Sequence, residues 1–216
     1  MAYNFTAASS QFLSSETTIF KSQNKITLAA WVYRNAAGTA QIVGPNKNAI
    51  HRIGFYSFTD NNLYFFIMNG LQPFGRIPAP AAAAWTHICM VFDGSQATNA
   101  TRLLGYVQGA QQTLTFVGTI PSSSSSNVDV ENFTINRAQF LPLFGNGQYA
   151  EVGVWHEPLT AAEIASLGAG VTCDKIRPQN LVFYAPLVRD LNDQKGGLTI
   201  TNNNAATVAA HPRVYA

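Results

Sequence analysis

Two glutamates near the end of one strand-like segment are the first residues to test for chemistry. Paired carboxyl groups hydrolyse glycosidic bonds, with retention when they are about 5–5.5 Å apart and with inversion at about 6.5–9.5 Å. Glu151 and Glu157 are six residues apart in the chain, which separates them by roughly 20 Å on a strand that rises about 3.3 Å per residue. Unless that strand breaks sharply, we predict solvated charges at the rim of a sheet, and a chain that is not an enzyme.

Histidine is the other residue type here that could supply a base or a metal ligand. His87 stands within an apolar strand-like segment, and no second His, Cys or carboxylate lies at the spacing of a zinc or catalytic motif. His156 and His211 also lack a partner nearby in the sequence. We therefore predict structural histidines, with no catalytic residue, no cofactor-binding residue and no metal-binding residue.

Calcium is the one cofactor that the residue types leave open. It takes carboxylate, amide and carbonyl oxygens, and these occur in three short clusters: Asp60 with Asn61 and Asn62, Asp93 with Ser95, and Asp190 with Asn192 and Asp193. None of the clusters matches a fixed ligand template. Asp, Asn and Ser also favour turns, because their side chains bond to nearby backbone groups, so turn chemistry is the preferred interpretation.

Sugar recognition is the remaining chemistry, because the face of an aromatic ring complements the apolar face of a pyranose. The candidates for such stacking are Tyr33, Tyr56, Tyr64, Phe74 and Tyr149. Packing in a core explains each of them equally well. The sequence alone therefore assigns no ligand-binding residue.

Strand signals dominate the chain, as short β-branched and aromatic runs with a period of two. Residues 25–34 show the pattern best, and both of their faces are apolar, as in an inner strand. Further strands are expected at residues 51–58, 63–68, 85–92, 103–107, 114–117, 132–135, 180–187 and 198–201. We expect loops at residues 78–84 and 122–126, the latter mobile and on the surface, and an irregular tail over about 202–216.

Residues 161–167 form the one segment that predicts a helix. Thr160 and Glu163 make a capping box before it, and Gly168 supplies a stop. Many short strands, one short helix and no βαβ alternation predict an all-β fold, a two-sheet antiparallel β-sandwich of the jelly-roll kind. A length of 216 residues suits a single domain, 1–216.

Composition limits the partners. Charged residues form only 11% of the chain and the formal net charge is +2, so no basic stripe neutralises phosphates and nucleic acid is not expected. No run reaches the roughly 18 apolar residues of a membrane-spanning helix, so no membrane insertion is expected. Met1 leads directly into a strand-like pattern, which predicts synthesis in a cytoplasm without a signal peptide.

Several stretches, in this order, resemble the laminin-G-like, concanavalin A-like lectin jelly-roll family. Residues 5–13 look like its opening strand, and residues 26–33 with Trp31 look like the next one. Residues 85–93, which begin Trp-Thr-His, are similar to its central strand, with the partner strand at 103–109. Residues 150–164 resemble its penultimate strand and short helix and are the most specific part. The resemblance implies a jelly roll that presents binding surfaces.

The block from Gly170 to Pro212 is similar to the ending of laminin-G-like proteins from phages and prophages. This resemblance implies a non-enzymatic virion structural protein, a decoration or cement subunit of a phage head. Its location would be the virion, and its partners the major capsid protein, other virion proteins or copies of itself. The alternative is a carbohydrate-binding adhesion module, including fibre or spike receptor binding, whose partners are cell-surface glycans. The sequence leaves open the position in the virion, the oligomeric state, the glycan and the contact residues.

Overall fold

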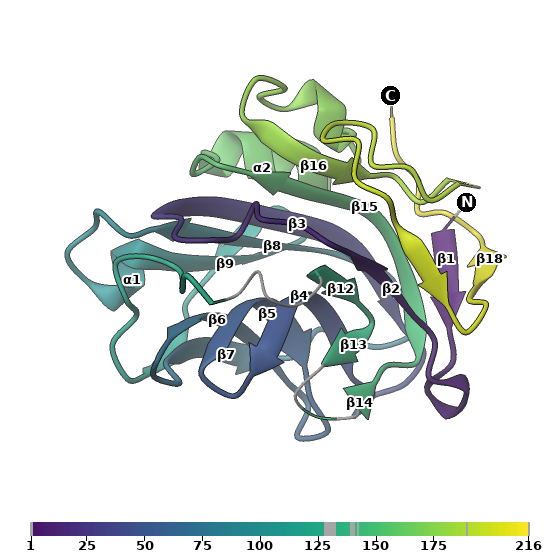
Figure 1. Cartoon of the computed structure of the whole chain (residues 1–216), viewed down its shortest axis with the longest axis horizontal. Coiled ribbons are helices and arrows are strands. Elements are labelled where there is room, and N and C mark those ends of the chain that lie inside the picture. The colour runs from purple at the N-terminus through teal and green to yellow at the C-terminus, as the bar shows by residue number, and fades with distance from the viewer. Residues whose placement is uncertain (1, 128–132, 139–140, 142, 189, 216) are drawn as a thin grey trace.

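Two antiparallel sheets packed face to face form the body of the molecule (Figure 1). The computed structural model describes residues 2–127, 133–138, 141, 143–188 and 190–215. Sheet A has the order β10 (Ala110–Gln112), β9 (Leu103–Val107), β8 (Trp85–Asp93), β3 (Lys25–Arg34), β15 (Gly147–Trp155), β1 (Ala2–Phe5) and β18 (Thr207–Ala209), with β16 (Leu181–Ala185) also paired to β15. Sheet B has the order β11 (Thr115–Val117), β7 (Phe74–Pro78), β6 (Asn62–Asn69), β5 (His51–Ser57), β4 (Gln41–Asn48), β12 (Phe133–Ile135), β2 (Phe12–Ser15) and β17 (Thr201–Asn203).

This architecture confirms the predicted all-β sandwich. A separate hairpin pairs β13 (Arg137–Ala138) with β14 (Leu143–Phe144). The helical segments of the described residues are short: α1 (Asn99–Arg102), α2 (Ala161–Gly168), and the 3-10 turns η1 (Ala7–Ser9) and η3 (Cys173–Lys175). In the part of the chain that the structure describes, none of these helices has the length and apolar character needed to cross a membrane.

Strand β3 shows how alternation places side chains in separate apolar clusters on its two faces. Ile26 and Leu28 point toward sheet B and join the main core between the sheets. Ala29 faces the other way, into a second apolar cluster beneath α2, and Trp31 packs with Val214 in a third. Pairing with β8 and β15 covers both edges of β3, and these clusters cover both of its faces, as the sequence predicts. Each large side chain buried in this way contributes about 1.5–3 kcal/mol.

Helix α2 covers part of the outer face of sheet A and begins where the sequence predicts. Thr160 Oγ1 accepts a hydrogen bond from the Glu163 backbone N–H, and the Glu163 carboxylate accepts one from the Thr160 N–H at 2.7 Å, which completes the capping box. The predicted stop at Gly168 is wrong by two residues. Gly168 is still helical, and the left-handed conformation that ends the helix lies at Gly170, with φ +103°.

Gly168 is required for a different reason, which gives a testable prediction. A Cβ atom at this position would lie 2.5 Å from the backbone N of Gly109, in the turn between β9 and β10. Alanine is about 1 kcal/mol better than glycine in a helix, but the clash is with backbone that cannot rotate away. We expect Gly168→Ala to destabilise the protein by about 1–3 kcal/mol in chemical denaturation. A variant more stable than the wild type would contradict this close packing.

The opening segment corrects one prediction. Residues 5–13 are not one strand, because the chain crosses between the sheets there: β1 belongs to sheet A, and β2 belongs to sheet B. Turn η1 lies between them, and Ser10 after it takes a left-handed φ of 51°. A residue in that conformation leaves the extended course of a regular strand, and here it turns the chain toward the other sheet.

The later part of the chain corrects three more. The strand expected at 198–201 lies at Thr201–Asn203, and the tail expected to be irregular contains β18, which pairs with β1. The run at 122–126 is not a mobile surface loop, because Ser124 and Ser125 are buried, and Ser124 Oγ donates to the Phe20 carbonyl at 2.6 Å. The strand expected at 132–135 is seen from Phe133, and Asn132 lies outside the described residues.

Candidate functional site

The two glutamates of β15 and its extension lie in different environments. Glu157 is part-exposed and its carboxylate pairs with Lys25 at 3.3 Å, as expected of a charge at the rim. For Glu151 that prediction is wrong, because its side chain is only 4% exposed. Tyr184 donates its hydroxyl to Glu151 Oε2 at 2.7 Å, and His211 Nε2 lies 3.4 Å from Oε1. The partner of His211 that the sequence did not show is therefore Glu151.

A β-bulge places Glu151 in this buried position. The register between β15 and β3 shifts between Ala150 and Gly153, and Glu151 adopts φ +51°. The bulge points the carboxylate toward Tyr184 on β16 and toward the C-terminal segment that carries His211. The cluster ties these segments to β15 under a covering of protein, which leaves no approach for a polymeric substrate.

The other histidines are held by the protein's own packing. His87 is 2% exposed on β8, beside Trp31 at 5.5 Å between ring centroids. Burial lowers its pKa to about 3, because the charged form is desolvated, and it is neutral near pH 7. The ring of His156 lies with Nε2 at 2.6 Å from the Ile19 carbonyl. Within the described residues, no three His, Cys, Asp or Glu side chains gather in a group that could hold a metal ion.

The three aspartate clusters have donors of their own around them. Asp60 accepts from the Asn62 amide side chain at 2.8 Å and from the Tyr64 hydroxyl at 2.5 Å. Asp93 accepts from the Ser95 hydroxyl at 2.6 Å. Asp193 is buried and accepts from three backbone N–H groups, those of Tyr184, Lys195 and Leu198. These bonds are turn chemistry, and dependence on calcium stays a matter for experiment.

Three of the five aromatic candidates come together on one surface. Tyr56 on β5, Tyr64 on β6 and Phe74 on β7 lie part-buried on the face of sheet B that points away from sheet A. We call these three residues the aromatic platform. The Tyr56 and Tyr64 rings are 5.3 Å apart at an interplanar angle of 25°, and Tyr64 and Phe74 are 5.1 Å apart. Tyr33 lies on sheet A and Tyr149 is fully buried, so the other two candidates are not part of it.

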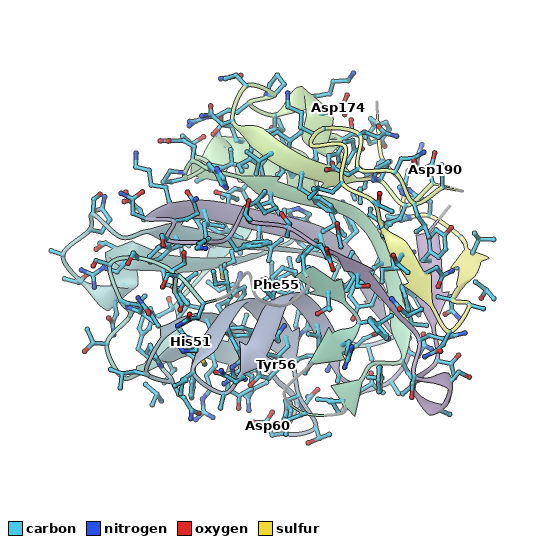
Figure 2. All side chains as sticks on the ribbon, viewed as in Figure 1. His51, Phe55, Tyr56, Asp60, Asp174 and Asp190 are labelled. Carbon is cyan, nitrogen blue, oxygen red and sulfur yellow. The ribbon has the colours of Figure 1, made fainter. Side chains whose placement is uncertain are left out.

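Strand alternation and register build this platform. Phe55 points into the main core, and its neighbour Tyr56 points outward (Figure 2). Tyr56 pairs directly with Tyr64 across β5 and β6, and neighbouring strands are about 4.7–4.9 Å apart. Outward side chains on adjacent strands therefore form a row of rings that crosses the sheet.

Charged and polar groups border the aromatic platform. The Arg52 guanidinium lies 5.9 Å from the centre of the Tyr56 ring and 5.3 Å from that of Phe66, in cation–π geometry. Arg76 pairs with Tyr64 in the strand register, and Asp60 accepts the Tyr64 proton. Burial, together with the Asp60 hydrogen bond, raises the pKa of Tyr64, so its hydroxyl remains a donor.

Arg52 and Phe66 are buried neighbours of the platform rings that the sequence reasoning missed. The signal was present, because alternation along residues 51–57 and 62–69 puts both on the same face as Tyr56 and Tyr64. Only the pairing of the strands shows that the guanidinium and the rings meet.

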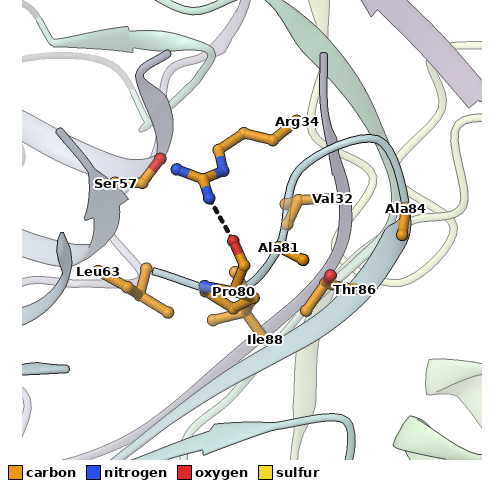
Figure 3. A pocket seen from close by; sticks show the side chains of 9 residues that line it. All are labelled: Val32, Arg34, Ser57, Leu63, Pro80, Ala81, Ala84, Thr86 and Ile88. Atoms are coloured by element: carbon orange, nitrogen blue, oxygen red, sulfur yellow. Dashed lines mark hydrogen bonds between the residues drawn. The ribbon is translucent and has the colours of Figure 1, made fainter. Parts of the chain in front are cut away.

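A small pocket lies at the edge between the two sheets. Arg34 spans it, donating to Asn61 Oδ1 at 2.9 Å and to the Pro80 carbonyl (Figure 3). The rest of the lining is Val32, Ser57, Leu63, Ala81, Ala84, Thr86 and Ile88. A volume of about 10 Å³ leaves room for about one water molecule. A sugar ring does not fit in this pocket. Larger, more open hollows of about 290 Å³ beside Leu104 and about 450 Å³ beside Asn192 lie elsewhere, and the aromatic platform is the candidate site because three rings gather on it.

Comparison with known families decides the relationship of the chain. A laminin-G model described as the concanavalin A-like lectin/glucanases superfamily matches residues 6–165. The chain belongs to this superfamily. That membership confirms the fold and the family implied by the sequence resemblance. A comparison with curated protein sequences finds no match.

Solved structures of this superfamily's shape include binding proteins and parts of enzymes. A candidate carbohydrate-binding protein from Bacteroides ovatus superposes with a TM-score of 0.73 at 16% identity over 100% of this chain and 61% of its own. The SAP-like pentraxin of Limulus polyphemus gives 0.58 at 15% identity, over 93% of this chain and 89% of its own. The NanB sialidase of Streptococcus pneumoniae gives 0.58 at 13% identity, over 76% of this chain and 27% of its own. The chain thus spans less than two thirds of the Bacteroides protein, and these likenesses show the fold alone.

Proposed function

We propose that this concanavalin A-like chain is a non-catalytic carbohydrate-binding module that binds a glycan on the aromatic platform. The observation that carries the proposal is the row of three rings on the outer face of sheet B, with spacings of 5.1 and 5.3 Å. Tyr56 and Tyr64 stack on each other and Phe74 meets Tyr64 edge to face, so the three part-buried rings together offer an apolar surface. Asp60 and Arg76 beside it supply an acceptor and a donor for sugar hydroxyls. The description of the Bacteroides ovatus protein as carbohydrate-binding supports the same class of function.

The shape of the platform favours binding over catalysis. An open sheet face stays wet, whereas glycoside hydrolysis needs two acids placed on either side of the bond. The buried Glu151 belongs to sheet A, and the platform belongs to sheet B. The only acid named beside the platform, Asp60, already accepts hydrogen bonds from Asn62 and Tyr64. A glycan held there would be recognised and left intact.

A glycan array with the purified chain tests the proposal. We expect saturable binding of a subset of glycans, and retention of that binding in a chelator, because the platform uses rings, one carboxylate and guanidinium groups. Signals abolished by the chelator would instead assign recognition to calcium and one of the aspartate turns. An array without any saturable signal would overturn the proposed function.

Replacing the central ring of the platform should weaken binding most. Tyr64 touches both other rings and holds Asp60, and a tyrosine at the centre of a contact surface is a typical hot spot worth about 2 kcal/mol or more. We expect Tyr64→Ala to raise the Kd about thirtyfold in titration calorimetry. Tyr33→Ala is the matched control, because Tyr33 is a part-buried ring packed on Trp85 in the opposite sheet. Equal losses in the two variants would contradict the assignment.

The role as a phage decoration protein stays a prediction from the sequence. It rests on the resemblance of the block from Gly170 to Pro212. In the described residues β10, β11, β17 and β18 are the outermost strands of the two sheets, where a neighbour could dock. Mass spectrometry and electron microscopy of purified particles would test it. Particles that lack the chain would contradict the role without affecting the glycan proposal.

A further inference from the structure

The aromatic platform is closed at one end. Ile42 on β4 pairs with Tyr56 and is fully buried, although it belongs to the outer row of sheet B. It is covered because the β13–β14 hairpin packs on it: Ile42 and Ala138 form one apolar cluster, with Tyr56 and Leu143 against it. The hairpin projects from the sheet beside β4 and β5 (Figure 1). Leu143 and Tyr56 both pack against this cluster, so the hairpin lies at the Tyr56 end of the platform.

Contacts on the side away from Tyr56 hold the β13–β14 hairpin. The Arg137 guanidinium lies 4.7 Å from the centre of the Phe12 ring, and Phe12 and Phe144 are 5.9 Å apart. Thr134 Oγ1 donates to the Arg137 carbonyl at 2.9 Å, which anchors the start of the hairpin on β12. These contacts join Arg137 and Phe144, one in each strand of the hairpin, to β2 and β12.

The opposite end of the platform is open. Beyond Phe74 comes only β11, in which Val117 pairs with Phe74 and is 48% exposed. Strand β11 has three residues and is the last strand of sheet B on this side, in the described part of the chain. Val117 is therefore the outward neighbour of Phe74 at this end, and it is exposed where Ile42, the neighbour of Tyr56 at the other end, is covered.

We infer, as an extension of the proposed function, that the aromatic platform binds the terminal sugars of a glycan chain and excludes internal segments. A row of rings that crosses three strands aligns a short run of sugar units perpendicular to the strands. An internal segment would have to continue past both ends of the row, and at Tyr56 it would meet Leu143. A chain end meets no such conflict, because the rest of the glycan leaves over β11.

Competition between polymers and their fragments tests this inference. Four soluble polysaccharides, β-glucan, mannan, galactan and pectin, are used intact and after partial acid hydrolysis, at equal sugar concentration. For the polysaccharide that binds, we expect the hydrolysate to inhibit binding at a sugar concentration at least about tenfold lower than the intact polymer requires, because hydrolysis increases the number of chain ends. Equal potency of the two forms would overturn the inference and leave the proposed function standing. Absence of binding to either form of all four would overturn the inference, and the glycan array decides the proposed function separately.

A variant with a shorter side chain at position 143 adds an independent measurement. In Leu143→Ala the path beyond Tyr56 opens, so the intact polymer should gain affinity and the ratio between hydrolysate and polymer should fall toward one. Leu71→Ala is the matched control, since Leu71 is 69% exposed at the turn between β6 and β7. An unchanged ratio in a Leu143→Ala protein with wild-type circular dichroism would overturn the blocking role of the hairpin. The wild-type ratio tests chain-end binding even if this variant does not fold.

Discussion

Replacing Glu151 with alanine is expected to lower the free energy of unfolding by about 3–5 kcal/mol, whereas Glu157→Ala should change it by less than about 1 kcal/mol. The two glutamates come from the same strand and its extension, and the chemical change is identical. Only their surroundings differ: Glu151 is 4% exposed, and Glu157 is 31% exposed beside a Lys25 that is 39% exposed.

The difference arises from the groups that each substitution leaves without a partner. Loss of Glu151 leaves the Tyr184 hydroxyl in a buried site without its acceptor, and an unsatisfied buried group costs about 1–3 kcal/mol. It also removes the carboxylate beside His211, whose ring nitrogens keep the Pro186 and Pro212 carbonyls. Loss of Glu157 leaves Lys25 free to turn into water. The φ of +51° at Glu151 does not contribute, because alanine and glutamate tolerate that conformation about equally poorly.

Urea denaturation of the two variants measures the difference, with equal m-values as the check that the same surface unfolds. His211→Ala should reproduce much of the Glu151→Ala effect, since it removes the other member of the pair. Equal stability of the Glu151→Ala and Glu157→Ala proteins would show that the buried cluster contributes nothing, and that the two acids are interchangeable rim charges after all.

The sandwich was predictable because its strands carry their own signal. In β3 apolar residues fill both faces between Lys25 and Arg34, with Thr27 as the one interruption, and the observed strand has the predicted bounds. Strand β7 was missed, because Gly75 and Arg76 interrupt its apolar pattern and Pro78 ends it after five residues. Without β7, Phe74 could not be assigned to the row that holds Tyr56 and Tyr64.

The site was predictable only as a set of residue types. Tyr56, Tyr64 and Phe74 were candidates from the sequence, but so were Tyr33 and Tyr149, and only strand register separates the two groups. Glu151 was misjudged because a bulge has no composition signal in β15. Its partner His211 lies 60 residues further along the chain, and spacing arguments do not extend over such a distance.

Acid should destabilise the protein through His87, and this is the second large effect expected. Its pKa is about 3 in the folded protein because of burial, against about 6.5 in an unfolded chain. Between these values the unfolded chain binds the proton and the folded protein does not, so stability falls as the pH falls. Above pH 6.5 neither state is protonated at His87, and the contribution is constant.

The size of the loss in stability follows from the difference between the two pKa values of His87. Each pKa unit corresponds to about 1.36 kcal/mol, so His87 alone should remove about 3–5 kcal/mol between pH 6.5 and 3. In His87→Gln the side chain does not titrate, and the variant should lose that much less stability than the wild type over the same window. Denaturant midpoints measured at intervals from pH 8 to pH 3 give both curves. Parallel curves would mean that protonating His87 in the folded protein costs nothing. Within the described residues, His87 Nδ1 is buried near Trp31 without a hydrogen-bond partner, which argues against that outcome.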